Sequence, residues 1–141
     1  RLGPELGRGS FGTVFLGTHI ISGEHVAIKL EDISISSLLQ HEAKFYELLQ
    51  EHESRVCRLH WHGATGTGQY ALILELLGPS LEELLRACGG RFSAATVVMI
   101  ARVLLKRFEC IHARGIVHRD IKPQNFAIPI ETAAAVAAAS S

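Results

Sequence analysis

Several features that would assign a protein class at once are scarce in this sequence. It has three cysteines, Cys57, Cys88 and Cys110, an odd number at wide spacing, which argues against both a disulfide framework and a Cys-x-x-Cys metal site. Neither sign of charge is in excess, because lysine plus arginine and aspartate plus glutamate number 14 each. Charge therefore gives no indication of nucleic acid or of a charged membrane as a partner.

A long hydrophobic run is missing as well. The stretch from Val97 to Leu105 is interrupted by Arg102, and it is far short of the apolar length that crosses a bilayer. The start of the chain does not combine a basic region with an apolar core, so it does not resemble a secretory signal. We expect a soluble protein of a reducing compartment, cytoplasmic and/or nuclear, that binds neither nucleic acid nor a membrane.

The two ends of the chain are typical of the limits of a fragment. The sequence opens at Arg1 without an initiator methionine and closes in an alanine-rich stretch at residues 133–139. Such a tail fits a short helix, a disordered end or an error in the predicted coding region, and composition does not separate these. With 48% hydrophobic residues, the chain still has enough apolar surface for a core.

The first half of the chain shows a pattern typical of strands. Up to about Glu75, short runs of β-branched, aromatic and aliphatic residues are separated by glycines, which predicts antiparallel strands. One helix is expected to begin after Ser37 as its cap and to end near Glu51. The predicted strands are 13–16, 26–30, 56–59 and 70–74, and the apolar residues of the helix are Leu38, Leu39, Phe45, Tyr46, Leu48 and Leu49.

The second half of the chain predicts helices. Ser80 and Glu83 form the pattern of a capping box, and Gly89-Gly90 can end that helix in a left-handed conformation. A longer helix follows Ser93, ends at Gly115 and carries an apolar stripe that we expect to lie in the core. Strands followed by helices indicate an α+β fold. The stripe consists of Val97, Ile100, Ala101, Leu104, Leu105, Phe108 and Ile111.

Three glycines, Gly7, Gly9 and Gly12, form a Gly-x-Gly-x-x-Gly pattern. This pattern is weak alone, because dinucleotide-binding turns and ordinary glycine-rich hairpins share it. The residues after Gly12 continue as a strand and not as a helix. We therefore predict a hairpin whose glycines let the backbone lie over phosphates.

A lysine, Lys29, ends the apolar run that begins at Val26. The simple interpretation is a solvated surface lysine near a strand end. The sharper one is a lysine that contacts the α- and β-phosphates of a nucleotide and is held by a carboxylate on the neighbouring helix. Glu42 fits this role, because its spacing from Leu38 and Leu39 places it on the inward helix face, where an unpaired charge is costly.

The strongest signal is the stretch at residues 118–125, which reads His-Arg-Asp-Ile-Lys-Pro-Gln-Asn. It resembles the catalytic loop of serine/threonine protein kinases, His-Arg-Asp-x-Lys-x-x-Asn. In that chemistry Asp120 orients the substrate hydroxyl and accepts its proton, Lys122 stabilises charge on the transferring phosphoryl group, and Asn125 binds Mg²⁺. We expect His118 and Arg119 to support the loop.

The resemblance narrows in the segment Leu74–Leu84, which contains Leu-Gly-Pro-Ser-Leu and looks like the hinge of the casein kinase 1 family; residues 116–126 fit this family too. The similarity implies a bilobal kinase fold, ATP with Mg²⁺, and phosphorylation of serine or threonine in proteins, near acidic or already phosphorylated residues. The implied division is an N-lobe at 1–74, a hinge and partial C-lobe at 75–127, and a low-complexity tail at 128–141.

The resemblance also implies an adenine pocket. Its walls would come from Leu6, Val14, Ala27 and Ala127, with Leu74 as the gatekeeper and the backbone of Glu75 and Leu77 bonding the purine edge. Ala127 departs from the larger aliphatic residue usual in the family, which could weaken nucleotide packing by about 1–3 kcal/mol.

A larger departure is that no aspartate occurs after Asp120, so the Asp-Phe-Gly of the kinase metal site is not found. We expect a fragment that is inactive alone. The alternative is a non-catalytic kinase-like module that binds a nucleotide or a partner, and an Asp-Phe-Gly beyond Ser141 would separate the two. His60 and His62 have a spacing that can ligate a metal, although no third ligand is near in sequence and a satisfied surface pair is the favoured interpretation.

Overall fold

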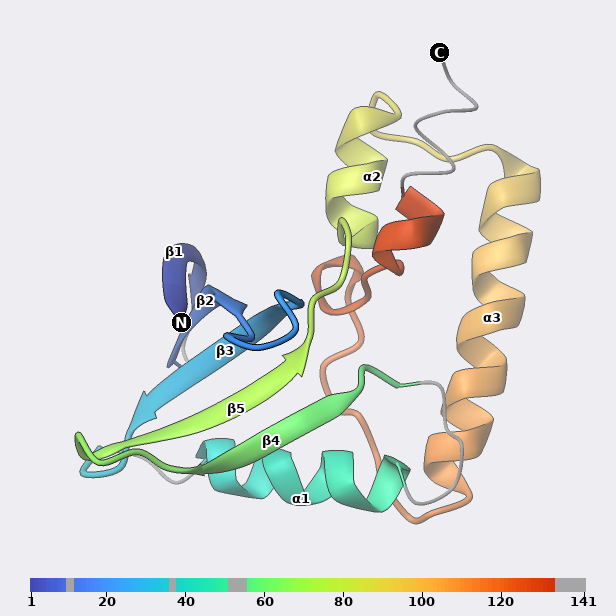
Figure 1. Cartoon of the computed structure of the whole chain (residues 1–141). Helices are drawn as coiled ribbons and strands as arrows, with labels where there is room; N and C mark the ends of the chain where they lie inside the picture. Colours follow the sequence, from blue (N-terminus) through green and yellow to red (C-terminus); the bar gives the residue numbers. More distant parts are fainter. Residues whose placement is uncertain (10–11, 36–37, 51–55, 134–141) are drawn as a thin grey trace. The chain divides into compact units, whose positions relative to one another are not determined.

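The computed structural model describes residues 1–9, 12–35, 38–50 and 56–133 (Figure 1). The chain forms two compact units, Arg1–Leu76 and Leu77–Ser141. The division follows the last strand of the first unit, whereas the sequence places the end of the first lobe after Leu74.

The first unit is an antiparallel sheet with one helix. Its five strands have the order β1-β2-β3-β5-β4, and every neighbouring pair is antiparallel. This confirms the predicted strand-rich, antiparallel first half. The elements are β1 (Leu2–Gly9), β2 (Gly12–Thr18), β3 (His25–Asp32), α1 (Leu38–Gln50), β4 (Leu59–Ala64) and β5 (Gln69–Glu75).

Helix α1 packs against the β4 and β5 side of the sheet (Figure 1). Leu39, Ala43 and Leu72 form the buried cluster, because residues at positions i and i+4 of a helix share the face that meets the sheet. The predicted apolar face is only partly correct. Leu38 and Leu48 are half exposed, since they lie to the side of the face centred on Leu39. Phe45 is half exposed in the same way. The predicted cap, Ser37, and the predicted end, Glu51, lie outside the described residues.

The predicted strand at 56–59 is wrong. The strand there begins at Leu59 and runs to Ala64, paired with β5 from Leu74 to Tyr70. Pairing with a neighbour decides which residues extend as a strand, and the local apolar content of Val56 and Cys57 does not.

The second unit contains helices α2 (Leu81–Ala87) and α3 (Ala94–His112) and a short 3₁₀ turn, η1 (Pro123–Asn125). The capping box is confirmed. The Glu83 N–H donates to the Ser80 hydroxyl over 3.2 Å, and the Ser80 N–H donates to the Glu83 carboxylate over 2.7 Å. Gly89, Gly90 and Gly115 all have positive φ, as helix-ending glycines do, and Ser93 caps α3.

The apolar stripe of α3 is not buried within the described part of the second unit. No residue of this helix is buried, and Val97 and Leu105 are 51% and 67% exposed. The prediction of a core stripe is therefore wrong for these residues, because the described residues of the unit do not provide a second layer that covers the whole face. Among the described residues, no helix is both long enough and apolar enough to span a membrane.

Candidate active site

The glycine-rich segment is a β-hairpin in the structure. β1 and β2 pair with Gly7 opposite Val14 and Gly9 opposite Gly12. The tip, residues 10–11, lies outside the described residues. Because the chain continues as strand β2 after the last glycine, the predicted hairpin is confirmed and a dinucleotide-binding turn that opens a helix is excluded.

Two of the three glycines differ in what the fold requires of them. Gly12 has a φ of +112°, and a Cβ there would collide with the carbonyl oxygen of Leu30. A Cβ on Gly7 would meet no described atom within 4 Å. The fold therefore requires glycine at position 12, whereas at position 7 it leaves open space beside the backbone, as close approach of a phosphate would need.

We expect these two glycines to respond differently to alanine. Gly12→Ala should lower the free energy of unfolding by about 1–3 kcal/mol or more, because its new methyl group meets backbone that cannot move aside cheaply. Gly7→Ala should change it by less than about 1 kcal/mol and weaken nucleotide binding instead. Thermal unfolding of both variants beside the parent measures the difference, and equal destabilisation would contradict it.

The ion pair between Lys29 and Glu42 is present. The Lys29 Nζ lies 2.6 Å from a Glu42 carboxylate oxygen, with the two side chains 19% and 33% exposed. The predicted salt bridge between β3 and α1 is thus confirmed. A charged hydrogen bond that is partly shielded from water holds the ammonium at one place beside the sheet.

Three residues proposed for the adenine pocket share the sheet face that carries Lys29. Val14 is opposite Lys29 in the β2–β3 pair, and Leu74 is opposite Ala27 in the β3–β5 pair. Residues directly opposite each other, and residues two apart on one strand, project from the same face. Val14, Ala27 and Leu74 therefore gather beside the lysine. Leu6, on β1, is 51% exposed.

At the end of β5, Glu75 is held by the segment before β4. Its N–H donates to the Arg58 carbonyl over 2.8 Å, and its carboxylate accepts from the Arg58 N–H over 3.1 Å. The Cys57 thiol donates to the Glu75 carbonyl over 3.4 Å. Burial, with the nearby Glu75 charge, raises the pKa of Cys57 to about 12, so the sulfur keeps the proton that it donates. The carbonyl oxygen retains a second lone pair for another donor.

Leu77 and Ala127 belong to the second unit, and their part in an adenine pocket remains a prediction. Within that unit, Ala127 lies opposite Ser80 in an antiparallel bridge. The Gly78 N–H donates to the Ile128 carbonyl over 2.8 Å. A Cβ on Gly78 would lie 3.1 Å from the same oxygen, a tight contact that this neighbour would have to relieve by a small shift.

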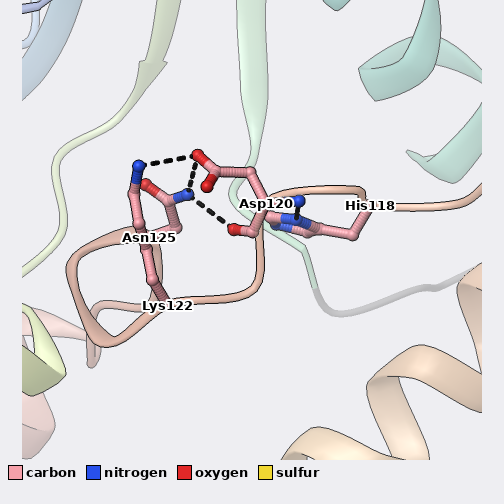
Figure 2. Close-up of polar contacts among 4 residues, drawn as sticks. All are labelled: His118, Asp120, Lys122 and Asn125. Carbon is pink, nitrogen blue, oxygen red and sulfur yellow. Dashed lines mark hydrogen bonds and ion pairs between the residues drawn. The ribbon is translucent and has the colours of Figure 1, made fainter.

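The catalytic-loop residues converge on one carboxylate (Figure 2). The Lys122 ammonium lies 2.8 Å from the Asp120 Oδ2. The Asn125 amide donates to the same Oδ2 and to the Asp120 carbonyl, each over 2.8 Å. Hydrogen bonds from Lys122 and then Asn125 lower the pKa of Asp120 below its ordinary value, so this group is a carboxylate at neutral pH. The predicted convergence is confirmed, and its position beneath the glycine-rich hairpin remains a prediction.

The backbone around Asp120 is supported from both sides. The Asp120 N–H donates to the His118 Nδ1 over 3.3 Å. The His118 ring lies 5.5 Å from the Phe126 ring and 6.1 Å from the Phe108 ring, measured between centroids. His118 thus has the supporting role predicted for it. Arg119 has a φ of 63°, a left-handed conformation that costs a non-glycine residue about 1 kcal/mol and is found at sites where the surroundings impose it.

The oxygens of this loop fit a magnesium ion in type. Because Asn125 uses its amide nitrogen for both bonds to Asp120, its Oδ1 takes part in neither of them. Carboxylate and amide oxygens are ligands that Mg²⁺ accepts. Within the described residues no group of three histidine, cysteine or acidic side chains gathers at a metal-binding distance. Asn125 is therefore a candidate for one of several ligands of a Mg²⁺ ion.

The family model for the protein kinase domain matches residues 1–135 of the chain. The chain therefore belongs to the protein kinase family. This family leads us to expect three features that the structure contains. The first unit has the antiparallel sheet with α1 and the ion pair between Lys29 and Glu42, and the second unit has the hydrogen-bonded Asp120 loop.

Some residues near the site have contacts that the sequence does not indicate. His62 has the Tyr70 hydroxyl at 2.6 Å from Nδ1 and a Glu47 carboxylate oxygen at 2.9 Å from Nε2, so it joins α1 to the sheet. Both of its ring nitrogens are satisfied by protein groups, as the favoured interpretation of this histidine expects. Glu31 is buried and bonded to α1. A charged residue two positions after Lys29, on the same strand face, was the available signal for it.

Proposed function

We propose that the chain is part of a casein kinase 1-type serine/threonine kinase that transfers a phosphoryl group from Mg-ATP to protein hydroxyls. The observation that carries the proposal is the pair of preformed polar sites, Lys29 with Glu42 and Asp120 with Lys122 and Asn125. The segment Leu74–Leu84 supports the casein kinase 1 type. Its Leu-Gly-Pro-Ser-Leu stretch is the part that resembles this family.

Each residue has a defined part in this reaction. Lys29 binds the α- and β-phosphates from its place beside Glu42, and Gly7, Gly9 and Gly12 let the hairpin backbone approach them. Asp120, held as a carboxylate, orients the substrate hydroxyl and receives its proton, while Lys122 balances charge on the transferring group. Asn125 would hold Mg²⁺, which supplies charge neutralisation between the phosphates when bound.

The same proposal covers the partners and the location. Protein substrates carry serine or threonine near acidic or phosphorylated residues, the protein acts in the cytoplasm and/or nucleus, and nucleic acid and membranes are not partners. A kinase-like module that binds a nucleotide or a partner without catalysis is the second candidate, favoured by the lack of any aspartate after Asp120 in the sequence. An Asp-Phe-Gly in a longer gene product would decide for the kinase.

A titration with a fluorescent ATP analogue tests the nucleotide part. We expect binding that ATP competes away and that Mg²⁺ strengthens. In Asn125→Ala the gain in nucleotide affinity caused by Mg²⁺ should be about tenfold smaller than in the parent, because one charge-assisted contact is lost. Gln124→Ala, an exposed neighbour in the same 3₁₀ turn, is the matched control and should leave it unchanged. Binding that ignores both ATP and Mg²⁺ would exclude the proposal.

Filling the space at Ala127 should tighten nucleotide binding. The residue is exposed in the second unit, so a larger side chain does not displace packed neighbours there. Ala127→Leu should lower the dissociation constant for ATP about five- to 150-fold, since the packing that a larger residue would add is about 1–3 kcal/mol. The same titration measures it, with Ala87→Leu on exposed α2 surface as control; no gain over this control would remove Ala127 from the pocket.

A further inference from the structure

Glu31 is the buried charged residue among those that the structure describes. It is 7% exposed and lies on β3 two positions after Lys29, so both side chains project from the same face of the strand. Its Oε2 accepts a hydrogen bond of 3.0 Å from the Leu39 N–H, in the first turn of α1. Strand β3 thus contributes two side chains that reach the same helix.

The hydrogen bond stabilises both the Glu31 carboxylate and the Leu39 N–H. A carboxylate taken out of water is costly unless donors satisfy it. The first N–H groups of a helix have no partner within the helix and carry partial positive charge. Leu39 is itself 1% exposed, so water does not readily serve its N–H, and the first turn of α1 contains no acidic residue. Glu31 supplies from the sheet the negative charge that this helix end lacks.

The position of this bond bears on the ion pair. Glu42 follows Leu39 by three residues, about one helical turn, so β3 holds α1 at two points one turn apart. One point is Glu31 with the Leu39 N–H, and the other is Lys29 with the Glu42 carboxylate over 2.6 Å. A rotation or shift of α1 that carries Glu42 away from Lys29 also draws the Leu39 N–H from Glu31, because the helix moves as a unit.

We propose that Glu31 is a positioning residue: it fixes the amino-terminal turn of α1 against β3 and thereby keeps Glu42 within reach of Lys29. The coupling between Glu31 and the ion pair is a property of the first unit alone. Its consequence for ATP rests on the function proposed above. The two statements are therefore separable by measuring the ion pair directly as well as nucleotide affinity.

The test follows the Glu42 side-chain carboxyl ¹³C resonance, assigned by its loss in Glu42→Gln, and the hydrogen exchange of the Leu39 amide in the full chain. Lys29→Met supplies the resonance position of an unpaired Glu42. In Glu31→Leu the Glu42 resonance should move at least about half of the way to that position, as a helix population shift requires. The Leu39 amide should exchange about tenfold faster. Glu24→Leu, at an exposed glutamate between β2 and β3, should change neither.

Glu31→Gln separates positioning from charge alone. Its amide oxygen can still accept from the Leu39 N–H, so the Glu42 resonance should stay close to its position in the parent. This rescue is not expected if Glu31 merely adds to stability. If Glu31→Leu does not fold, Glu31→Asp replaces it, since the shorter side chain reaches less far. An unchanged Glu42 resonance in folded Glu31→Leu or Glu31→Asp overturns the proposal. A shift of this resonance in Glu31→Gln as large as that in Glu31→Leu overturns it too.

Nucleotide titration of the same variants tests the positioning role of Glu31 separately from the proposed nucleotide function. A moved Glu42 resonance with an ATP affinity reduced about five- to tenfold supports both the positioning role and the proposed function. A moved resonance in a chain that binds no ATP, parent included, supports the positioning role and rejects the nucleotide function. An unmoved resonance in a chain that does bind ATP rejects the positioning role only.

Discussion

Replacement of Lys29 by methionine is expected to raise the dissociation constant for ATP about 30- to 150-fold. The estimate is the loss of a charge-assisted hydrogen bond to phosphate, about 2–3 kcal/mol. The ammonium is held 2.6 Å from Glu42 and is 19% exposed, so little flexibility is lost when it meets a ligand. Methionine keeps the length and apolar part of the side chain, which limits the change to the charge.

The same change should affect stability much less. Glu42 is left without the ammonium, but its side chain is 33% exposed and solvent screens its charge. We expect the melting temperature to fall by a few degrees at most, as for a loss of about 1 kcal/mol in a chain of this length. Lys44→Met, on an exposed position of the same helix, is the matched control. An ATP affinity equal in both variants would show that Lys29 does not contact the nucleotide.

Residues whose role follows from local rules were predictable from the sequence. The Ser80 and Glu83 cap, and the left-handed glycines 89, 90 and 115, depend on neighbours within a few positions. The pairing of Lys29 with Glu42 is long-range, yet it was predictable too. An acidic residue on an inward helix face needs a cation, and few cations precede it on a strand.

Features that depend on a partner segment were not predictable. Leu59–Ala64 became β4 because β5 pairs with it, although the apolar run before it is the better local strand candidate. The stripe of α3 has the periodicity of a core helix, but periodicity does not say whether a covering layer is present. The left-handed backbone at Arg119 has no sequence signal, because arginine does not favour that conformation.

The 141-residue chain is expected to phosphorylate casein no faster than its own Asp120→Asn variant. Kinases turn over at about 1–100 s⁻¹, and loss of one preorganised electrostatic group costs on the order of 10²–10³ in rate. The chain has Asn125 as one oxygen donor, but no aspartate after Asp120 to complete the pair that the kinase metal site uses. The exposed Asp120 carboxylate, however well held by Lys122 and Asn125, does not replace a missing metal ligand.

The measurement is incorporation of radiolabelled phosphate from ATP with Mg²⁺ and casein, for the parent and for Asp120→Asn. A nucleotide titration on the same preparation shows whether the protein is folded and binds ATP. If it does, a lack of incorporation is not caused by an unfolded sample. Incorporation well above the Asp120→Asn background would mean that these residues alone complete the metal site. The expected result is no incorporation above background together with ATP binding that Lys29→Met weakens about 30- to 150-fold, because Lys29 lies in the first unit and its partner Glu42 is already in place.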